Sequence, residues 1–274
     1  MYSGTTLTSA SGRLLGAHQK IDRLSRSCLR LLLKKDQDFP TAKQILHFEG
    51  SRGPDAIKRK SPAVDEPWHY YTPYDDSDRQ IINLLADHYK RLVAALKESD
   101  EVRAAFEAAW IAHTIVDGLT PAHHFPYEQK LAELRGGEDK TSRTSYKAKI
   151  IMPGETSRQQ ISNNWQMWGP KGLLTSHIWF EWGVAVAIAP LTFRKSIVSE
   201  KDIQELREHG LEVLFARKAK EIASLKIYDG FSKTGWTPRL SRQVRNQLLP
   251  IVVRTVTLAW FAACAEAGKG GAKL

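Results

Sequence analysis

Residues 99–125 read SDEVRAAFEAAWIAHTIVDGLTPAHHF and contain the clearest helical pattern of the chain. Apolar side chains recur there at intervals of three and four residues, which is the spacing of one helix face. Ser99 supplies the expected N-cap, and the helix should run to about Asp117. The apolar pattern also includes His113, so an ionisable side chain is expected to face the core.

Similar patterns recur along the rest of the chain, and no segment alternates apolar and polar residues as a half-buried strand would. The sequence therefore predicts an all-α fold with one compact multi-helix domain over residues 13–267, flanked by flexible termini at 1–12 and 268–274. Residues 50–73, rich in Gly and Pro, and the polar residues 136–172 are expected to be irregular. We expect further helices over residues 13–35, 41–48, 78–98, 173–190, 200–225 and 238–267.

The composition limits the class of protein. The 274 residues carry a formal net charge of +10, which favours anionic partners such as phosphate esters, nucleic acid or acidic lipid head groups. Only Cys28 and Cys264 are present, which excludes a cysteine zinc site and leaves room for one long-range disulfide. The N-terminus lacks the pattern of a signal peptide, and the most apolar stretch, residues 183–191, is too short to span a bilayer. We therefore expect a cytoplasmic protein with no transmembrane segment.

Histidines and acids share helix faces more often than chance predicts. With nine histidines and thirty acids in the chain, about one histidine would have an acid four residues later. Four do: His18 with Asp22, His113 with Asp117, His124 with Glu128, and His177 with Glu181. Such a pair can bind a metal ion, but a buried hydrogen bond would also explain His113 with Asp117, and an exposed helix end would explain His177 with Glu181.

Taken in order, the candidate residues form a recognisable series: His18, Asp55 of GPDAI, His69, then His113, Asp117 and His123 in an HxxxDxxxxxH pattern, then His177 and Glu181 in an HxxxE pattern. This series resembles the zinc-dependent phospholipase C family, whose superfamily includes the single-strand-specific zinc nucleases. The resemblance covers roughly residues 13–267, and the HxxxDxxxxxH spacing is its most specific part. It implies an all-α domain of the phospholipase C/zinc nuclease type, with zinc ions at the bottom of a cleft.

The resemblance also implies how the ligands are shared among the metals. One zinc would be held by Asp55, His69, His113 and Asp117, and a second by His123, His177 and Glu181. His18, with Asp117 bridging, would contribute to a third zinc. In the family this third zinc also binds the amino group of an N-terminal tryptophan, whereas the first tryptophan here is Trp68. We therefore expect two zinc ions and leave the third site open.

The implied activity is that of a zinc-dependent phosphoric ester hydrolase, in which metal-activated water attacks a phosphodiester and Asp55 positions or deprotonates that water. The substrate would be an anionic phosphate ester, either a phospholipid head group or a nucleotide. The basic surface could contact an acidic membrane or nucleic acid. Two alternatives remain: a nuclease or nucleotidase of the same superfamily, and a non-catalytic helical binding module stabilised by metal.

Other side chains could contact a substrate, or simply be packed or solvated. Basic residues flank Asp55: Arg52, Lys58, Arg59 and Lys60. Four tryptophans could stack on bases, contact lipid or pack: Trp165, Trp168, Trp179 and Trp182. The insertion over residues 124–176 is either a substrate-facing lid or a solvated surface, and it is rich in basic residues: Lys130, Arg135, Lys140, Arg143, Lys147 and Lys149.

Overall fold

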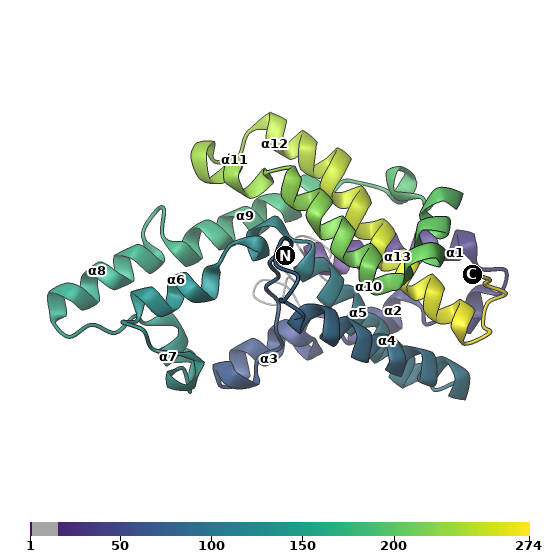
Figure 1. The fold of residues 1–274 in the computed structure, drawn as a ribbon, viewed down its shortest axis with the longest axis horizontal. Helices are drawn as coiled ribbons and strands as arrows, with labels where there is room; N and C mark the ends of the chain where they lie inside the picture. Colours follow the sequence, from purple (N-terminus) through teal and green to yellow (C-terminus); the bar gives the residue numbers. More distant parts are fainter. Residues whose placement is uncertain (2–15) are drawn as a thin grey trace.

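The computed structural model describes residues 1 and 16–274, apart from the side chains of Gln37, Ser51, Arg59 and Phe193. Over these residues the chain forms thirteen α-helices, short 3₁₀ turns and one π-helical turn, with no β-strand (Figure 1). The predicted all-α, multi-helix fold is confirmed. The expected flexible segment 1–12 lies outside the described residues, except for residue 1.

Most of the helices pack into one body around α13. This helix is apolar on nearly all sides and buried along most of its length, as expected for a helix that other helices surround. It contacts α1, α4, α5 and α10. The helices of the body are α1 (Ala17–Leu32), α2 (Ala42–His47), α4 (Gln80–Glu98), α5 (Glu101–Gly118), α9 (Leu173–Ile188), α10 (Glu200–Ser224), α11 (Ile227–Thr234), α12 (Pro238–Gln243) and α13 (Leu249–Glu266).

The helical run Pro238–Glu266 is long and apolar enough to cross a membrane, judged by length and composition alone, with a mean hydropathy of 1.8 in its most apolar window. However, 89% of that window is buried inside the fold, which is typical of a core helix. The expectation that no stretch was long enough was wrong on this point. The charged residue Arg254 interrupts the apolar residues of this helix, so the longest uninterrupted apolar stretch of the sequence lies elsewhere.

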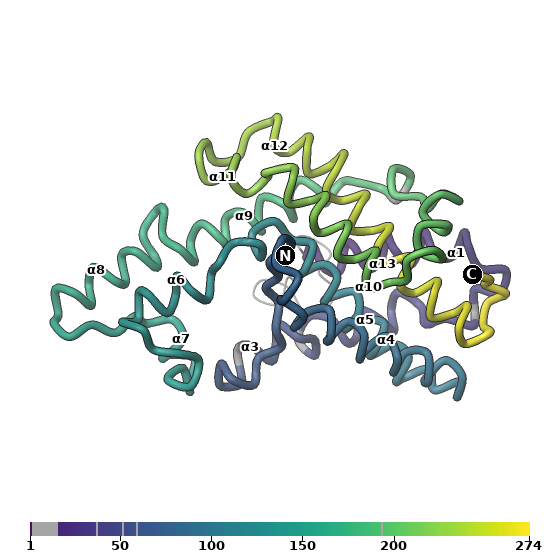
Figure 2. Tube along the Cα trace, in the orientation of Figure 1, coloured from purple at the N-terminus to yellow at the C-terminus, as the bar shows by residue number. Residues whose placement is uncertain are grey.

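Three helices form an arm, residues 127–172, that extends from one end of the body (Figures 1 and 2). They are α6 (Tyr127–Leu134), α7 (Tyr146–Ile150) and α8 (Ser157–Trp168). The arm has a small core of its own, formed by Tyr127, Leu131, Met152 and Met167. The prediction that residues 136–172 are irregular was therefore wrong. Its polar composition hid α8, which begins where the Thr156 side chain accepts a hydrogen bond from the Gln159 amide.

Three other local predictions need correction. The segment 50–73 contains α3 (Pro54–Lys60), which starts at a proline because the first helical turn needs no amide donor there. Ser99 ends α4 with a φ of 58°, and it is Asp100 that caps α5 by accepting from the Arg103 amide. Helix α10 is interrupted at Gly210, whose φ of 74° suits glycine.

The C-terminal segment that we expected to be loose makes specific contacts. The Gly270 carbonyl accepts hydrogen bonds from the amides of Lys34 and Lys35, and the Gly270 amide donates to Asp38 Oδ2. Both cysteines are free and buried, so the disulfide that the sequence left open does not form.

Trp260 joins α13 to the helix that carries the candidate site. Its side chain is fully buried, and its indole N–H donates to the carbonyl oxygen of Ala108 in α5 at 3.1 Å. Its ring also contacts the ring of Phe39, with 5.6 Å between the centroids. The position of α5 relative to the core therefore depends on this side chain.

We expect Trp260→Ala to lower the free energy of unfolding by about 3–5 kcal/mol, because it leaves a cavity and removes a buried hydrogen bond. Trp260→Phe should lower it by less, since most of the volume is kept. Urea unfolding followed by circular dichroism measures both changes. Equal stability of the wild type and Trp260→Ala would contradict the central position of this side chain.

Candidate metal centre

The centre forms where α5 ends. His113 and Asp117 lie one turn apart near the end of α5, and the 3₁₀ turn Pro121–His124 that follows carries His123. All three side chains are buried. The HxxxDxxxxxH spacing therefore brings its three ionisable residues together by way of one helix and the turn after it.

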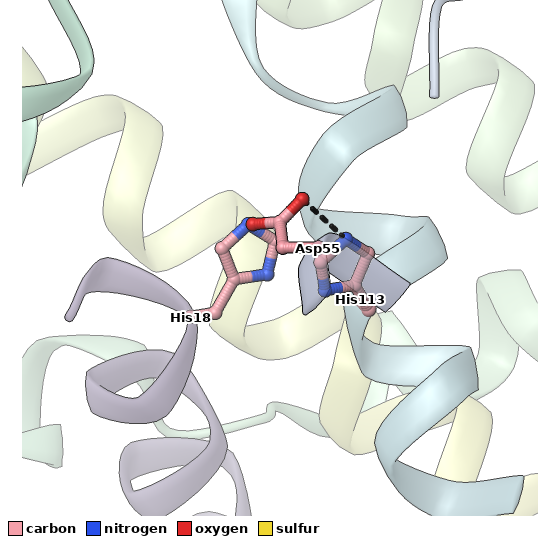
Figure 3. A group of neighbouring side chains, drawn as sticks. All are labelled: His18, Asp55 and His113. Carbon is pink, nitrogen blue, oxygen red and sulfur yellow. Dashed lines mark ion pairs between the residues drawn. The ribbon is translucent and has the colours of Figure 1, made fainter. Parts of the chain in front are cut away.

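The first group of candidate ligands consists of His18 from α1, Asp55 from α3 and His113 from α5. One ligand atom of each residue lies within 4.8 Å of the other two (Figure 3). His113 Nε2 is 3.7 Å from Asp55 Oδ1, and the rings of His18 and His113 stack with their centroids 4.1 Å apart. Three helices that are far apart in sequence thus supply one compact cluster.

The second group consists of His123, His177 and Glu181, whose ligand atoms also lie within 4.8 Å of one another. Glu181 Oε1 lies 3.0 Å from His123 Nε2 and 3.1 Å from His177 Nε2. The two imidazole rings are parallel, with 5.1 Å between their centroids. These are the same three residues that the resemblance places around one zinc.

Asp117 lies between the two groups. Its Oδ1 is 3.3 Å from His18 Nε2 and 3.5 Å from His123 Nδ1, while its Oδ2 is 3.1 Å from His113 Nε2. Burial opposes the charge of Asp117, but the Met1 amino group and the nearby histidines hold the pKa of its carboxyl group well below its usual range. One ionised carboxylate therefore contacts histidines of both groups, as a bridging ligand would.

Glu49 was missed by the sequence analysis. Its buried Oε1 lies 3.0 Å from His113 Nδ1, so that this N–H donates a hydrogen bond to the carboxylate and Nε2 is left facing Asp55 and Asp117. Burial alone would lower the pKa of His113, but the carboxylates of Glu49, Asp117 and Asp55 raise it to about 10. No motif marks Glu49, because its partner lies 64 residues away.

Two ammonium groups lie among these carboxylates. Lys58 Nζ is 2.7 Å from Asp55 Oδ1 and 3.8 Å from Asp117 Oδ2. The α-amino group of Met1 is 3.0 Å from Asp117 Oδ1 and 3.3 Å from Glu181 Oε1. Ionised carboxylates in a buried centre require nearby positive charge, and the two ammonium groups supply it. These two ammonium groups therefore offset part of the negative charge of the centre.

His69 lies beside the centre but outside both groups. Its ring centroid is 5.3 Å from that of His123, and its Nδ1 is 3.2 Å from the carbonyl oxygen of Pro67. It lines a narrow cavity together with Lys58, His113 and Asp117. The ligand set expected from the resemblance is thus only partly assembled in the first group, where His18 lies beside Asp55 and His113.

The other histidine–acid pairs serve different purposes. His124 Nε2 lies 2.9 Å from the Gly118 carbonyl oxygen, to which it donates, and Glu128 pairs instead with Arg143 at 2.6 Å. Asp22 lies close enough to Glu49 that burial and this neighbouring charge raise the pKa of Asp22 well above its usual value. Helical spacing alone therefore did not separate ligands from structural residues.

Of the four basic residues flanking Asp55, Lys58 is the one found in the centre among the described side chains. Arg52 contacts the ring of His47, and Lys60 is exposed to solvent. The Arg59 side chain lies outside the described residues. The structure therefore does not place the whole basic run at the centre, and of the described side chains only Lys58 remains a candidate for substrate binding.

Several buried atoms facing the centre have no hydrogen-bond partner among the described residues. They are His18 Nε2, His113 Nε2, Asp117 Oδ2 and His123 Nδ1. The three nitrogens lie within ion-pair distance of Asp117 but not in hydrogen-bond geometry, and a metal ion in each group would give these atoms a partner. Imidazole nitrogens and carboxylate oxygens without thiolates are ligands that zinc accepts in hydrolytic sites. The residues therefore fit a metal.

Comparisons of the chain with protein-family models, with curated proteins and with solved structures gave no match. The resemblance to the phospholipase C family therefore stays a prediction. The geometry of the two groups and of Asp117 is what supports a function.

We expect Glu49→Gln to lower the pKa of His113 from its value of about 10, because it removes the negative charge nearest to the imidazole while keeping a hydrogen-bond acceptor. NMR titration of the His113 ring protons in chelator-treated protein measures this change. Glu98→Gln, at the exposed end of α4, serves as the matched control and should leave the pKa in place. An unchanged pKa in Glu49→Gln would show that Glu49 does not set the state of His113.

Proposed function

We propose that the protein is a zinc-dependent phosphoric ester hydrolase similar to the phospholipase C family. The observation that carries this proposal is the position of Asp117, which contacts histidines of two separate His/carboxylate groups. Adjacent metal sites that share a carboxylate are suited to phosphate esters, because two metals can act on one phosphoryl group. If His113 and Asp117 formed only a structural hydrogen bond, Asp117 would have no need of a second His/carboxylate group beside it.

The metal ligands would come from the two groups. His123, His177 and Glu181 would hold one zinc, and His18, Asp55 and His113 would hold the other, with Asp117 shared between them. Catalytic zinc sites bind three protein ligands and keep a further position for water or substrate. With Asp117 shared, each zinc would have four protein ligands, so a catalytic water would need a fifth position, which zinc can adopt during catalysis.

Bound zinc lowers the pKa of a coordinated water and offsets the charge of the phosphoryl oxygens. Asp55 would accept a hydrogen bond from the attacking water and so position it, because its side chain is partly open to solvent. Burial opposes its charge, but Lys58 and His113 hold the pKa of the Asp55 carboxyl group well below its usual range. The ammonium group of Lys58, next to Asp55, would donate to an anionic phosphate oxygen.

We expect about two zinc ions per wild-type chain, measured by mass spectrometry of the purified protein after zinc reconstitution and desalting. Asp117→Asn should weaken zinc affinity about 10–100-fold, since the neutral amide is a poorer bridge between the groups. Asp87→Asn, on the exposed side of α4, is the matched control and should leave zinc affinity unchanged. The proposal fails if the wild type takes up no zinc.

The reaction is tested by supplying zinc and measuring hydrolysis of phosphatidylcholine, p-nitrophenyl phosphorylcholine, single-stranded DNA and mononucleotides. We expect both choline esters to be cleaved, chelation to stop cleavage, and Asp55→Asn to lower kcat about 10²–10⁴-fold. Cleavage of DNA or nucleotides alone would favour the nuclease alternative. Stoichiometric zinc binding with no hydrolysis of any ester would favour the non-catalytic module.

A further inference from the structure

Helix α8 presents large apolar side chains to solvent. The exposed fractions of Ile161, Trp165 and Trp168 are 72%, 68% and 42%. Their spacing of four and then three residues places them on one face of the helix. Three large apolar side chains on one face are unusual for a helix in contact only with water.

The opposite face of α8 holds the helix in the arm. Met167 is buried in the core of the arm, and the Asn164 side chain accepts from the Met152 amide and donates to the Met152 carbonyl oxygen. Figure 1 shows α8 at the far end of the arm, away from the helices of the body. The orientation of α8 within the arm is therefore fixed, with Met167 in the core of the arm and the apolar face exposed.

The charged residues of α8 and of the turn after it have one sign. Residues 157–172 contain Arg158 and Lys171 and no acid. Arg158 precedes Ile161 by three residues and so lies on the same stripe. Neither cation forms an ion pair within the described part of the chain, whereas Lys130, Arg135, Arg143 and Lys149 of the arm are all paired with glutamates.

We propose that α8 docks the protein on the surface of an anionic lipid bilayer. Exposed tryptophans partition to the interface between acyl chains and head groups, and an adjacent aliphatic side chain enters the apolar layer. Arg158 and Lys171 would then contact anionic head groups. A nucleic-acid surface is a poorer fit, because bases stack on aromatic rings and the most exposed side chain of this stripe is the aliphatic Ile161.

Docking through α8 would link the lipid surface to the candidate metal centre through the end of the arm and α9. Helix α9 begins at Leu173, directly after the arm, and His177 lies one turn further along. A groove of about 540 Å³ between α6 and α8 is lined by Lys130, Glu133 and Lys171, and it extends to Phe125 and Leu173, which are near the second group in sequence. The choice of a phospholipid as substrate rests on the proposed function, whereas the docking itself does not.

The test measures co-sedimentation of the full chain with vesicles of phosphatidylcholine alone and with 30 mol% phosphatidylglycerol, alongside binding to a single-stranded oligonucleotide. We expect at least tenfold tighter binding to the anionic vesicles, and quenching of tryptophan fluorescence by brominated acyl chains. Ile161→Ser with Trp165→Ser should reduce vesicle binding at least tenfold. The control is Val102→Ser with Val213→Ser, which removes exposed valines of α5 and α10 and should change nothing.

Hydrolysis of soluble p-nitrophenyl phosphorylcholine separates the two proposals, because that ester needs no membrane. The Ile161/Trp165 variant should keep this activity at the wild-type level. Docking is overturned if the wild type does not bind anionic vesicles, if the variant binds them as well as the wild type, or if α8 is instead required for binding the oligonucleotide. Vesicle binding without hydrolysis of the soluble ester would support docking and count against the proposed function.

Discussion

The buried carboxylate of Asp117 constrains the arrangement of the whole centre. An ionised carboxylate shielded from water costs several kcal/mol unless positive charge and hydrogen-bond donors surround it. Here the histidines come from α1, from α5 itself and from the turn after α5. These elements must therefore pack closely at the end of α5, and the contacts of α13 with α1 and α5 hold them there.

The charges of the molecule are separated between surface and centre. The chain has a formal net charge of +10, yet four acids gather in the candidate metal centre: Glu49, Asp55, Asp117 and Glu181. Anions approaching the basic surface would thus meet a negative centre unless cations occupy it. Lys58, the Met1 amino group and the proposed zinc ions would each supply that positive charge. With these cations in place the centre would attract an anionic substrate, and a phosphate ester is such a substrate.

The sequence predicted the long helices well because their apolar faces repeat over many turns. The spacing predicted that His177 and Glu181 share one helix face, and the resemblance to the phospholipase C family placed His123 with them. The contact of Glu49 with His113 and the exclusion of His69 from the first group could not be predicted from the sequence, because both depend on contacts between distant segments. Helices α3 and α8 were missed for another reason: Gly, Pro and polar residues hide short helices that are stabilised mainly by packing and caps.

The account depends on metal ions at two positions joined by Asp117. The most direct measurement is X-ray diffraction from crystals of the zinc-loaded protein, with data collected on both sides of the zinc absorption edge. The account predicts two strong anomalous peaks, one among His123, His177 and Glu181 and one among His18, Asp55 and His113, with an Asp117 oxygen next to each. An ordered centre with no anomalous peak in either group would contradict it.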